Sequence, residues 1–192
     1  MDNHQDNQRK IAVFGGSRVA RESEQYAEAY EVGRRLAQAG MAVVNGGYSG
    51  SMEASAKGAR EAGGRVIGVT SAFFARNEMN PFIDEEIPTD DLYNRIRHLV
   101  VRSDGYIVLR GSIGTLAELL IVWNIATIDP HFNRPIILLG EPWKNVIRAL
   151  QENLAIAPEH FQHLTFAATP EECIEHLKHE LEGRPPVAWQ GA

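Results

Sequence analysis

Glu118 closes a glycine-bearing segment that reads RGSIGTLAE, and its carboxylate is a first candidate for chemistry in this sequence. The segment follows the apolar run GYIVL, which is typical of a buried strand. Because glycine weakens regular structure, Gly111 and Gly114 between a strand and a helix indicate that the backbone approaches something closely. Glu118 lies one helical turn beyond Thr115, so one rigid helix can hold a ligand at its start and present a carboxylate to it.

Two more glycine turns follow apolar runs, FGGSR at 14–18 and NGGYSGSME at 45–53. The turns at 45–53 and 110–118 lead into helices, whose free N–H groups and positive dipole end favour a phosphate. The hydroxyls of Ser49, Ser51 and Thr115 add donors for an anion, cap these helices, or do both. A single such turn is weak evidence, but together they predict a phosphate-binding site. Its expected residues are Gly15, Ser17, Gly46, Gly47, Ser49, Gly50, Met52, Gly111, Ser112, Ile113, Gly114 and Thr115, with Arg110 as an extra phosphate contact.

The elements that must position these turns are short apolar runs that alternate with longer segments of helical periodicity. This alternation predicts an α/β, Rossmann-like parallel sheet with helices on both faces. The stretch 71–90 contains Pro81 and Pro88 and is expected to be a long excursion without regular structure on the active-site side. Strands are expected at 10–14, 41–45, 64–70, 105–109, 134–140 and near 164–168, and helices at 21–40, 50–63, 90–102, 114–126, 142–153 and from 170.

Length and composition predict one domain and still allow a small anionic ligand. With 192 residues and 44% hydrophobic content, the chain is expected to form a polar arm at 1–9, one nucleotide-binding domain at 10–182 and a Pro-containing tail at 183–192. A net charge of -6 without a basic run argues against nucleic acid or a membrane surface as the partner. The single cysteine, Cys173, and the lack of an apolar leader favour a cytoplasmic protein.

The residues from Ile11 to Leu139 resemble the LOG family of nucleoside 5′-monophosphate phosphoribohydrolases, also called lysine-decarboxylase-like. The family's first motif is three glycines, two variable residues and Gly-Leu-Met-Gly, and its second is Pro-Gly-Gly-x-Gly-Thr-x-x-Glu. The first corresponds to Asn45, Gly46, Gly47, Gly50, Ser51, Met52 and Glu53, and the second to Gly111, Gly114, Thr115 and Glu118. This chain departs from the second motif at Arg110, in place of proline, and Ser112, in place of glycine. Ile96 also replaces the basic residue that usually follows the catalytic arginine. The chain thus resembles a divergent, bacterial-type member.

The resemblance implies that Arg95 and Glu118 are the catalytic pair, and that the N-glycosidic bond of a nucleoside 5′-monophosphate, AMP or a cytokinin type, is cleaved to free base and ribose 5-phosphate. A carboxylate near the anomeric carbon would stabilise an oxocarbenium-like sugar, hold ribose hydroxyls or activate water. The resemblance also implies a homodimer that needs no cofactor. Spacing alone leaves a structural ion pair as the alternative role for Arg95 and Glu118.

A non-catalytic protein is the competing interpretation, because relatives with this fold carry nucleotide-like cofactors such as molybdenum cofactor without cleaving them. A disturbed RGSIG loop would suit such a carrier.

The sequence disfavours a metal-binding protein and a dinucleotide dehydrogenase. The histidine pairs at 160/163 and 176/179 lack the companion ligands of a metal site. FGGSRVA lacks the glycine spacing of dinucleotide dehydrogenases.

Overall fold

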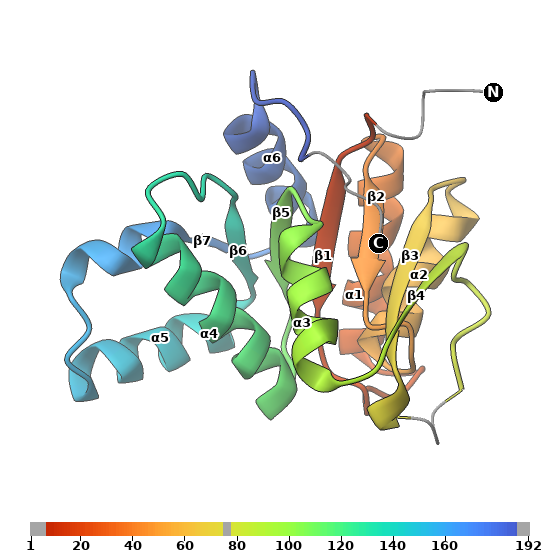
Figure 1. Cartoon of the computed structure of the whole chain (residues 1–192), viewed down its shortest axis with the longest axis horizontal. Helices are drawn as coiled ribbons and strands as arrows, with labels where there is room; N and C mark the ends of the chain where they lie inside the picture. The colour runs from red at the N-terminus through yellow and green to blue at the C-terminus, as the bar shows by residue number, and fades with distance from the viewer. Residues whose placement is uncertain (1–6, 75–77, 188–192) are drawn as a thin grey trace.

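The computed structural model describes residues 7–74 and 78–187, and these form one α/β unit around a seven-stranded sheet (Figure 1). Every pair of neighbouring strands is parallel, which confirms the predicted Rossmann-like architecture. The strands are β1 (Lys10–Phe14), β2 (Ala42–Asn45), β3 (Val66–Ser71), β4 (Glu85–Thr89), β5 (Gly105–Val108), β6 (Ile136–Leu139) and β7 (Leu164–Ala167). The helices are α1 (Glu24–Gln38), α2 (Ser51–Glu61), α3 (Leu92–Val101), α4 (Ile113–Ile128), α5 (Glu141–Asn153) and α6 (Pro170–Leu181), with short 3₁₀ segments at Ala72–Phe74 and Pro158–His163.

The strand order β4-β3-β2-β1-β5-β6-β7 reverses direction at the centre of the sheet. From β1 the chain moves outward through β2 and β3 to β4, and α3 then carries it back to β5 on the other side of β1. The connections that leave β1 and β5 therefore diverge, and this leaves a crevice at their carboxyl ends. Open α/β sheets bind ligands at such a switch point.

Apolar side chains of β1 point alternately to the two faces of the sheet, because successive residues of a strand face opposite ways. Ile11 and Val13 join one core cluster with α1, α2 and α6. Ala12 and Phe14 join a second cluster with α3, α4 and α5 on the other face. Burial on both faces explains why the central strands appear as continuous apolar runs in the sequence.

Strand β4 is the main difference from the sequence prediction, which expected no regular structure between residues 71 and 90. β4 lies at the edge of the sheet and pairs only with β3, with Thr70 opposite Pro88. Proline is tolerated on an edge strand because its missing N–H can face away from the neighbouring strand. Only Ile87 and Thr89 of this strand are buried, so its sequence lacks the apolar run that identified the others.

Side-chain caps set the start of several helices. The Ser23 hydroxyl accepts the N–H of Tyr26, so α1 begins at Glu24 rather than at the predicted residue 21. Asp91 caps α3 and Thr169 caps α6 in the same way. The cap on α3 fixes the start of the helix that carries Arg95.

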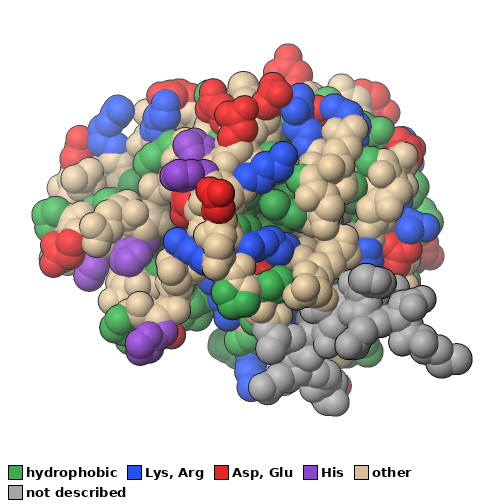
Figure 2. Space-filling view, turned by 90° about the horizontal axis from the view of Figure 1, so that it is seen from above, with side chains coloured by type: hydrophobic (Ala, Val, Ile, Leu, Met, Phe, Trp, Pro, Cys, Tyr) green, Lys and Arg blue, Asp and Glu red, His purple; other side chains and the backbone are tan. Residues whose placement is uncertain are grey.

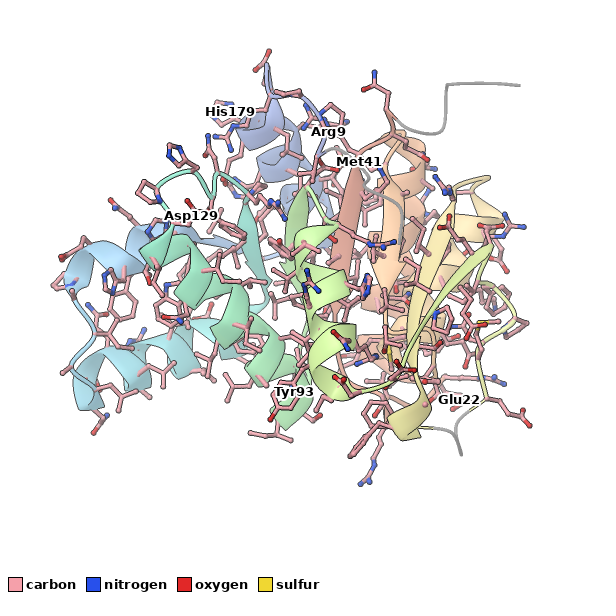
Figure 3. The ribbon with its side chains drawn as sticks, viewed as in Figure 1. Arg9, Glu22, Met41, Tyr93, Asp129 and His179 are labelled. Carbon is pink, nitrogen blue, oxygen red and sulfur yellow. The ribbon has the colours of Figure 1, made fainter. Side chains whose placement is uncertain are left out.

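All strands begin at one end of the sheet and finish at the opposite end, because they are parallel. Figure 3 labels Arg9 and Met41 near the amino ends of the strands, and Tyr93 and Glu22 near the carboxyl ends. Seen from above in Figure 2, the amino-terminal edge carries acidic, basic and histidine side chains that are intermixed rather than a patch of one charge. No helix within the described ranges is both long and apolar enough to cross a membrane.

The predicted arm and tail fall partly outside the described residues, which begin at residue 7 and end at residue 187. The described part of the tail folds back on the domain. The Val187 N–H donates to Asp104 Oδ1 at 2.5 Å, and Arg184 Nη1 donates to the Asn133 carbonyl at 2.7 Å.

Candidate functional site

Arg95 projects from α3 into the crevice and is buried, with 6% of its surface exposed. Its Nε donates to the Val69 carbonyl at 2.9 Å, and its Nη2 donates to the Gly46 carbonyl at 3.2 Å. The rings of Tyr48 and Phe74 lie 5.7 and 5.5 Å from its Cζ atom. Burial lowers the pKa of Arg95, and attraction to a nearby carboxylate opposes that shift. The guanidinium is therefore held in one orientation by main-chain oxygens and two rings.

Gly46 permits this arrangement, because a Cβ atom at this position would overlap the Arg95 guanidinium and lie 2.6 Å from the Met52 sulfur. Gly50 has a different constraint: its φ of +69° lies in the region that glycine adopts most easily. The Ser51 N–H, next along the chain, donates to the Gly16 carbonyl at 2.9 Å and ties this turn to the β1–α1 turn. These two glycines of the first motif therefore shape the crevice.

Glu118 lies on α4 and faces Arg95, with 12% of its side chain exposed. Arg95 Nη1 and Glu118 Oε1 are 3.6 Å apart, which is an ion pair but too long for a hydrogen bond. Burial raises the pKa of Glu118 to about 7, although Arg95 pulls it down. A carboxyl group that exchanges its proton near neutral pH suits general acid–base chemistry.

The hydroxyls of Thr115 and Ser51 are buried at the starts of α4 and α2, each residue being 2% exposed. Neither hydroxyl has a hydrogen-bond partner within the described residues. A buried polar atom without a partner costs about 1 to 3 kcal/mol, so the Thr115 hydroxyl, which lines a cavity together with Arg95 and Glu118, is a favourable position for a ligand oxygen. The free N–H groups of the two helix starts add donors for an anion.

The inner pocket is the cavity of about 130 Å³ that Arg95 and Glu118 line together with Ser17, Gly46, Ser112 and Thr115. Tyr48, Phe74 and Leu99 form its apolar wall. Its volume is below the roughly 300 to 1,000 Å³ usual for small-molecule sites, so a whole nucleotide would extend beyond it. The inner pocket combines an ion pair, two helix starts and an aromatic wall.

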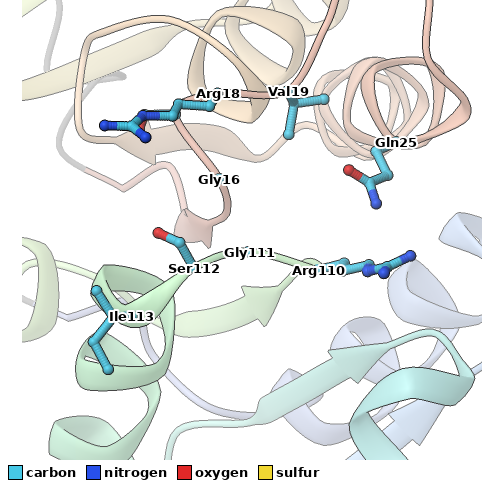
Figure 4. Close-up of a pocket in the computed structure, with 9 residues that line it drawn as sticks. Gly16, Arg18, Val19, Gln25, Arg110, Gly111, Ser112 and Ile113 are labelled. Carbon is cyan, nitrogen blue, oxygen red and sulfur yellow. The ribbon is translucent and has the colours of Figure 1, made fainter.

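The outer pocket adjoins it and measures about 440 Å³. It lies between the turn at residues 16–19 and the turn at residues 110–113, with Gln25 of α1 at its side (Figure 4). The two pockets share Ser17 and Ser112. Arg18 and Arg110 line the outer pocket, and no described Asp or Glu does.

The structure brings most of the predicted site residues to these two pockets. The inner pocket contains Gly15, Ser17, Gly46, Met52, Arg95, Ser112, Gly114, Thr115 and Glu118, and the outer pocket contains Ser17, Arg110, Gly111, Ser112 and Ile113. Gly47, Ser49 and Gly50 line neither of them. The Ser49 hydroxyl donates to the Ser17 carbonyl at 3.0 Å, and the Gly47 N–H donates to Asn45 Oδ1 at 2.9 Å, so both stabilise the loops instead.

Ser112, which stands in place of the family's glycine, has an ordinary backbone conformation. Its φ is -113°, in the extended region open to any residue. No described residue other than glycine has a positive φ. Ser112 therefore introduces no backbone strain, and Ser112→Gly is not expected to relieve any.

Sequence reasoning missed the aromatic wall and half of the outer pocket. Tyr48 lies inside the first glycine motif, and its position there was the available signal. Phe74 belongs to the segment after β3, and nothing in the sequence indicates that its ring reaches Arg95. Arg18 closes the FGGSR turn and could have been paired with Arg110 once β1 and β5 were placed side by side.

The fold and the site define a Rossmann-like α/β protein whose glycine turns surround a buried arginine–glutamate pair at the switch point. The chain matches the SLOG cluster4 family over residues 8–174, and it belongs to this family. Among the described residues, no group of three or more His, Cys, Asp or Glu side chains is arranged to hold a metal ion.

The proteins to which this chain is similar include enzymes and a cofactor-binding protein. The chain is 37% identical over 117 residues to a cytokinin riboside 5′-monophosphate phosphoribohydrolase of Mycobacterium tuberculosis, covering 60% of this chain and 62% of the relative. It is 30% identical to a probable enzyme of the same name from Oryza sativa subsp. japonica, covering 96% of this chain and 82% of the relative. The molybdenum cofactor binding protein of Rippkaea orientalis has a similar structure, with a TM-score of 0.73 and 25% identity, over 90% of this chain and 96% of that protein. The chain is thus a distant homologue of LOG enzymes with structural similarity to a cofactor-binding protein.

Proposed function

We propose that this protein binds a nucleoside 5′-monophosphate across the inner pocket and hydrolyses its N-glycosidic bond to free base and ribose 5-phosphate. The observation that carries the proposal is the buried Glu118 carboxyl, whose pKa burial raises to about 7, next to the fixed guanidinium of Arg95. A solvent-exposed structural ion pair would not need this burial. The homology to phosphoribohydrolases supports the same chemistry.

In the proposed reaction, the 5′-phosphate binds at the start of α4, where the Thr115 hydroxyl and free N–H groups are available. Glu118, one turn further along the helix, then lies near the anomeric carbon. Its carboxylate takes a proton from water while the water oxygen bonds to the anomeric carbon. The bond to the base breaks and the base keeps the electron pair; the base then takes the proton that Glu118 accepted from water, which returns Glu118 to its carboxylate form. Positive charge that develops on the sugar is stabilised by the carboxylate.

Incubation with a panel of nucleoside 5′-monophosphates, followed by chromatography of the products, tests the proposal. Wild type is expected to release base and ribose 5-phosphate in equal amounts from at least one member of the panel. Glu118→Gln is expected to bind the same nucleotide without turnover, because the amide keeps the shape but cannot accept the proton. Glu152→Gln, which changes an exposed glutamate on α5, is the matched control and should keep full activity. Turnover by Glu118→Gln at the wild-type rate would refute the proposed role.

Cofactor carriage is the second candidate, favoured by the similarity to the molybdenum cofactor binding protein of Rippkaea orientalis. The residues present fit the phosphate of such a cofactor, because the two pockets offer helix-start N–H groups, the unpartnered Thr115 hydroxyl, and Arg18 and Arg110. A carrier does not require Glu118 to exchange a proton. Tight binding of a nucleotide or of the cofactor, with no base released from any monophosphate, would establish the carrier and exclude the hydrolase.

We also propose a homodimer that forms through α4. This helix is apolar around its whole circumference: Leu119, Val122 and Trp123 are buried in the domain, yet Leu120 and Ile121 on its other side are partly exposed. Ile113 and Ile128 at its two ends are 79% and 70% exposed. A helix that is apolar all round is normally covered on every side, so a second copy is the expected cover.

A further inference from the structure

The outer pocket is larger than the inner pocket, and a nucleotide bound in the inner pocket must extend beyond it. It continues directly from the position proposed for the 5′-phosphate, because Ser17 and Ser112 belong to both pockets. A ligand whose phosphate lies between these serines therefore has an open path outward. What extends along that path depends on the chemistry of the outer pocket.

That chemistry is cationic. Arg18 comes from the β1–α1 turn and Arg110 from the opposite turn after β5, and neither forms an ion pair or hydrogen bond within the described residues. In the view of Figure 4, Gln25 and Arg110 lie on one side of the pocket, and Arg18 and Ser112 on the other. The chain as a whole has a net charge of -6, so two unpaired guanidiniums around a cavity without a carboxylate form a local exception. Guanidinium groups bind phosphate oxygens well.

We propose that the outer pocket is a subsite for a second phosphate joined to the 5′-phosphate, so that the preferred ligand is a nucleoside 5′-diphosphate or an ester of one. The inference rests on the proposed binding of a nucleotide in the inner pocket. Arg110 replaces the proline of the related motif, and it provides the charge that a proline could not. A nucleobase is a poorer occupant, because two cationic side chains without a neighbouring carboxylate favour an anion.

Calorimetric titration with three ligands tests the subsite in magnesium-free buffer, on the Glu118→Gln background so that no ligand is consumed. AMP carries the 5′-phosphate alone, ADP adds a second phosphate beyond it, and adenosine 3′,5′-bisphosphate adds one at the other end of the ribose. ADP is expected to bind about tenfold more tightly than AMP or better. The 3′,5′-bisphosphate is expected to gain no such advantage, because its additional phosphate cannot reach the outer pocket.

Arginine variants test whether Arg110 and Arg18 cause the tighter binding of ADP. Arg110→Ala, and the double variant with Arg18→Ala, should bring the ratio of ADP to AMP affinity down towards one. Arg148→Ala, which removes an exposed arginine from α5, is the matched control and should leave the ratio unchanged. Equal affinities for AMP and ADP in the parent would overturn the subsite while leaving the nucleotide function intact. Equal weakening of both ligands by Arg110→Ala would instead mean that Arg110 contacts a part that AMP and ADP share, which overturns the subsite, and absence of any nucleotide binding would overturn the proposed function together with the subsite.

Discussion

The pKa of Glu118 makes stability a direct test of the site, independent of any substrate. Burial raises this pKa from the ordinary 4.5 to about 7 in the folded protein. Between these values the folded protein holds a proton that the unfolded chain has released, so the free energy of unfolding falls as pH rises through this window. At about 1.36 kcal/mol per pH unit, the interval corresponds to a loss of about 3 kcal/mol, complete above pH about 7.

Glu118→Gln removes this titration, because the amide stays neutral in both states. Below pH 4.5 Glu118 is protonated in both the folded and the unfolded wild type, so the two proteins differ there only by a constant; the attraction between Arg95 and the ionised Glu118 is already included in the folded pKa. Above pH 7 the variant should have gained about 3 kcal/mol relative to wild type. The test is therefore how the difference in free energy of unfolding between wild type and Glu118→Gln changes with pH, and not the size of that difference at any one pH.

Urea denaturation at a series of pH values between 4 and 8 measures this difference, provided that unfolding is two-state. Glu152→Gln, which removes an exposed carboxylate from α5, supplies the baseline. A difference between wild type and Glu118→Gln that is flat across the whole range would refute the raised pKa. A difference that moved in the opposite direction would mean that Arg95 outweighs burial and holds the carboxylate ionised.

Further predictions concern the shape of the site and the assembly. Gly46→Ala should remain folded but lose at least about 1 kcal/mol of stability and most of any turnover, because its methyl group displaces Arg95; denaturation and base release measure the two effects. Gly114→Ala adds a methyl group where no atom lies within 4 Å, so its free energy of unfolding should stay within about 0.5 kcal/mol of wild type or rise, and a loss comparable to that of Gly46→Ala would contradict the packing argument. Leu120→Glu and Ile121→Glu should convert a dimer into a folded monomer in light scattering after size exclusion; a monomeric wild type would exclude the proposed interface.

The central sheet could be predicted because its strands are buried on both faces and so form uninterrupted apolar runs. The run KIAVF predicted β1 at the residues that the structure assigns to it. β4 could not be predicted in this way, because an edge strand contacts the core at only a few positions and EEIPT contains a proline and two glutamates. The position of β4 is set by its hydrogen bonding to β3, and the residues of β3 lie earlier in the chain.

The meeting of Arg95 with Glu118 could be anticipated from the family motifs, and the structure brings the two side chains within ion-pair distance across α3 and α4. The neighbours of this pair could not be anticipated from those motifs. Tyr48 and Phe74 reach Arg95 from segments separated by β3, and their contact depends on how the turn after that strand folds. The sequence likewise could not show that Ser112 has an ordinary extended backbone, because residue type alone does not determine φ.

The way Arg95 is anchored has a consequence for tracing the history of this family. Its hydrogen-bond acceptors at Val69 and Gly46 are main-chain carbonyls, which persist whatever side chains evolve at those two positions. A relative without the proposed hydrolysis would still use this arginine to hold the strand ends together, whereas no hydrogen bond among the described residues requires Glu118 to remain acidic. If the proposed function is correct, the residue at position 118, rather than the arginine, should separate relatives that carry out the chemistry from those that keep only the architecture.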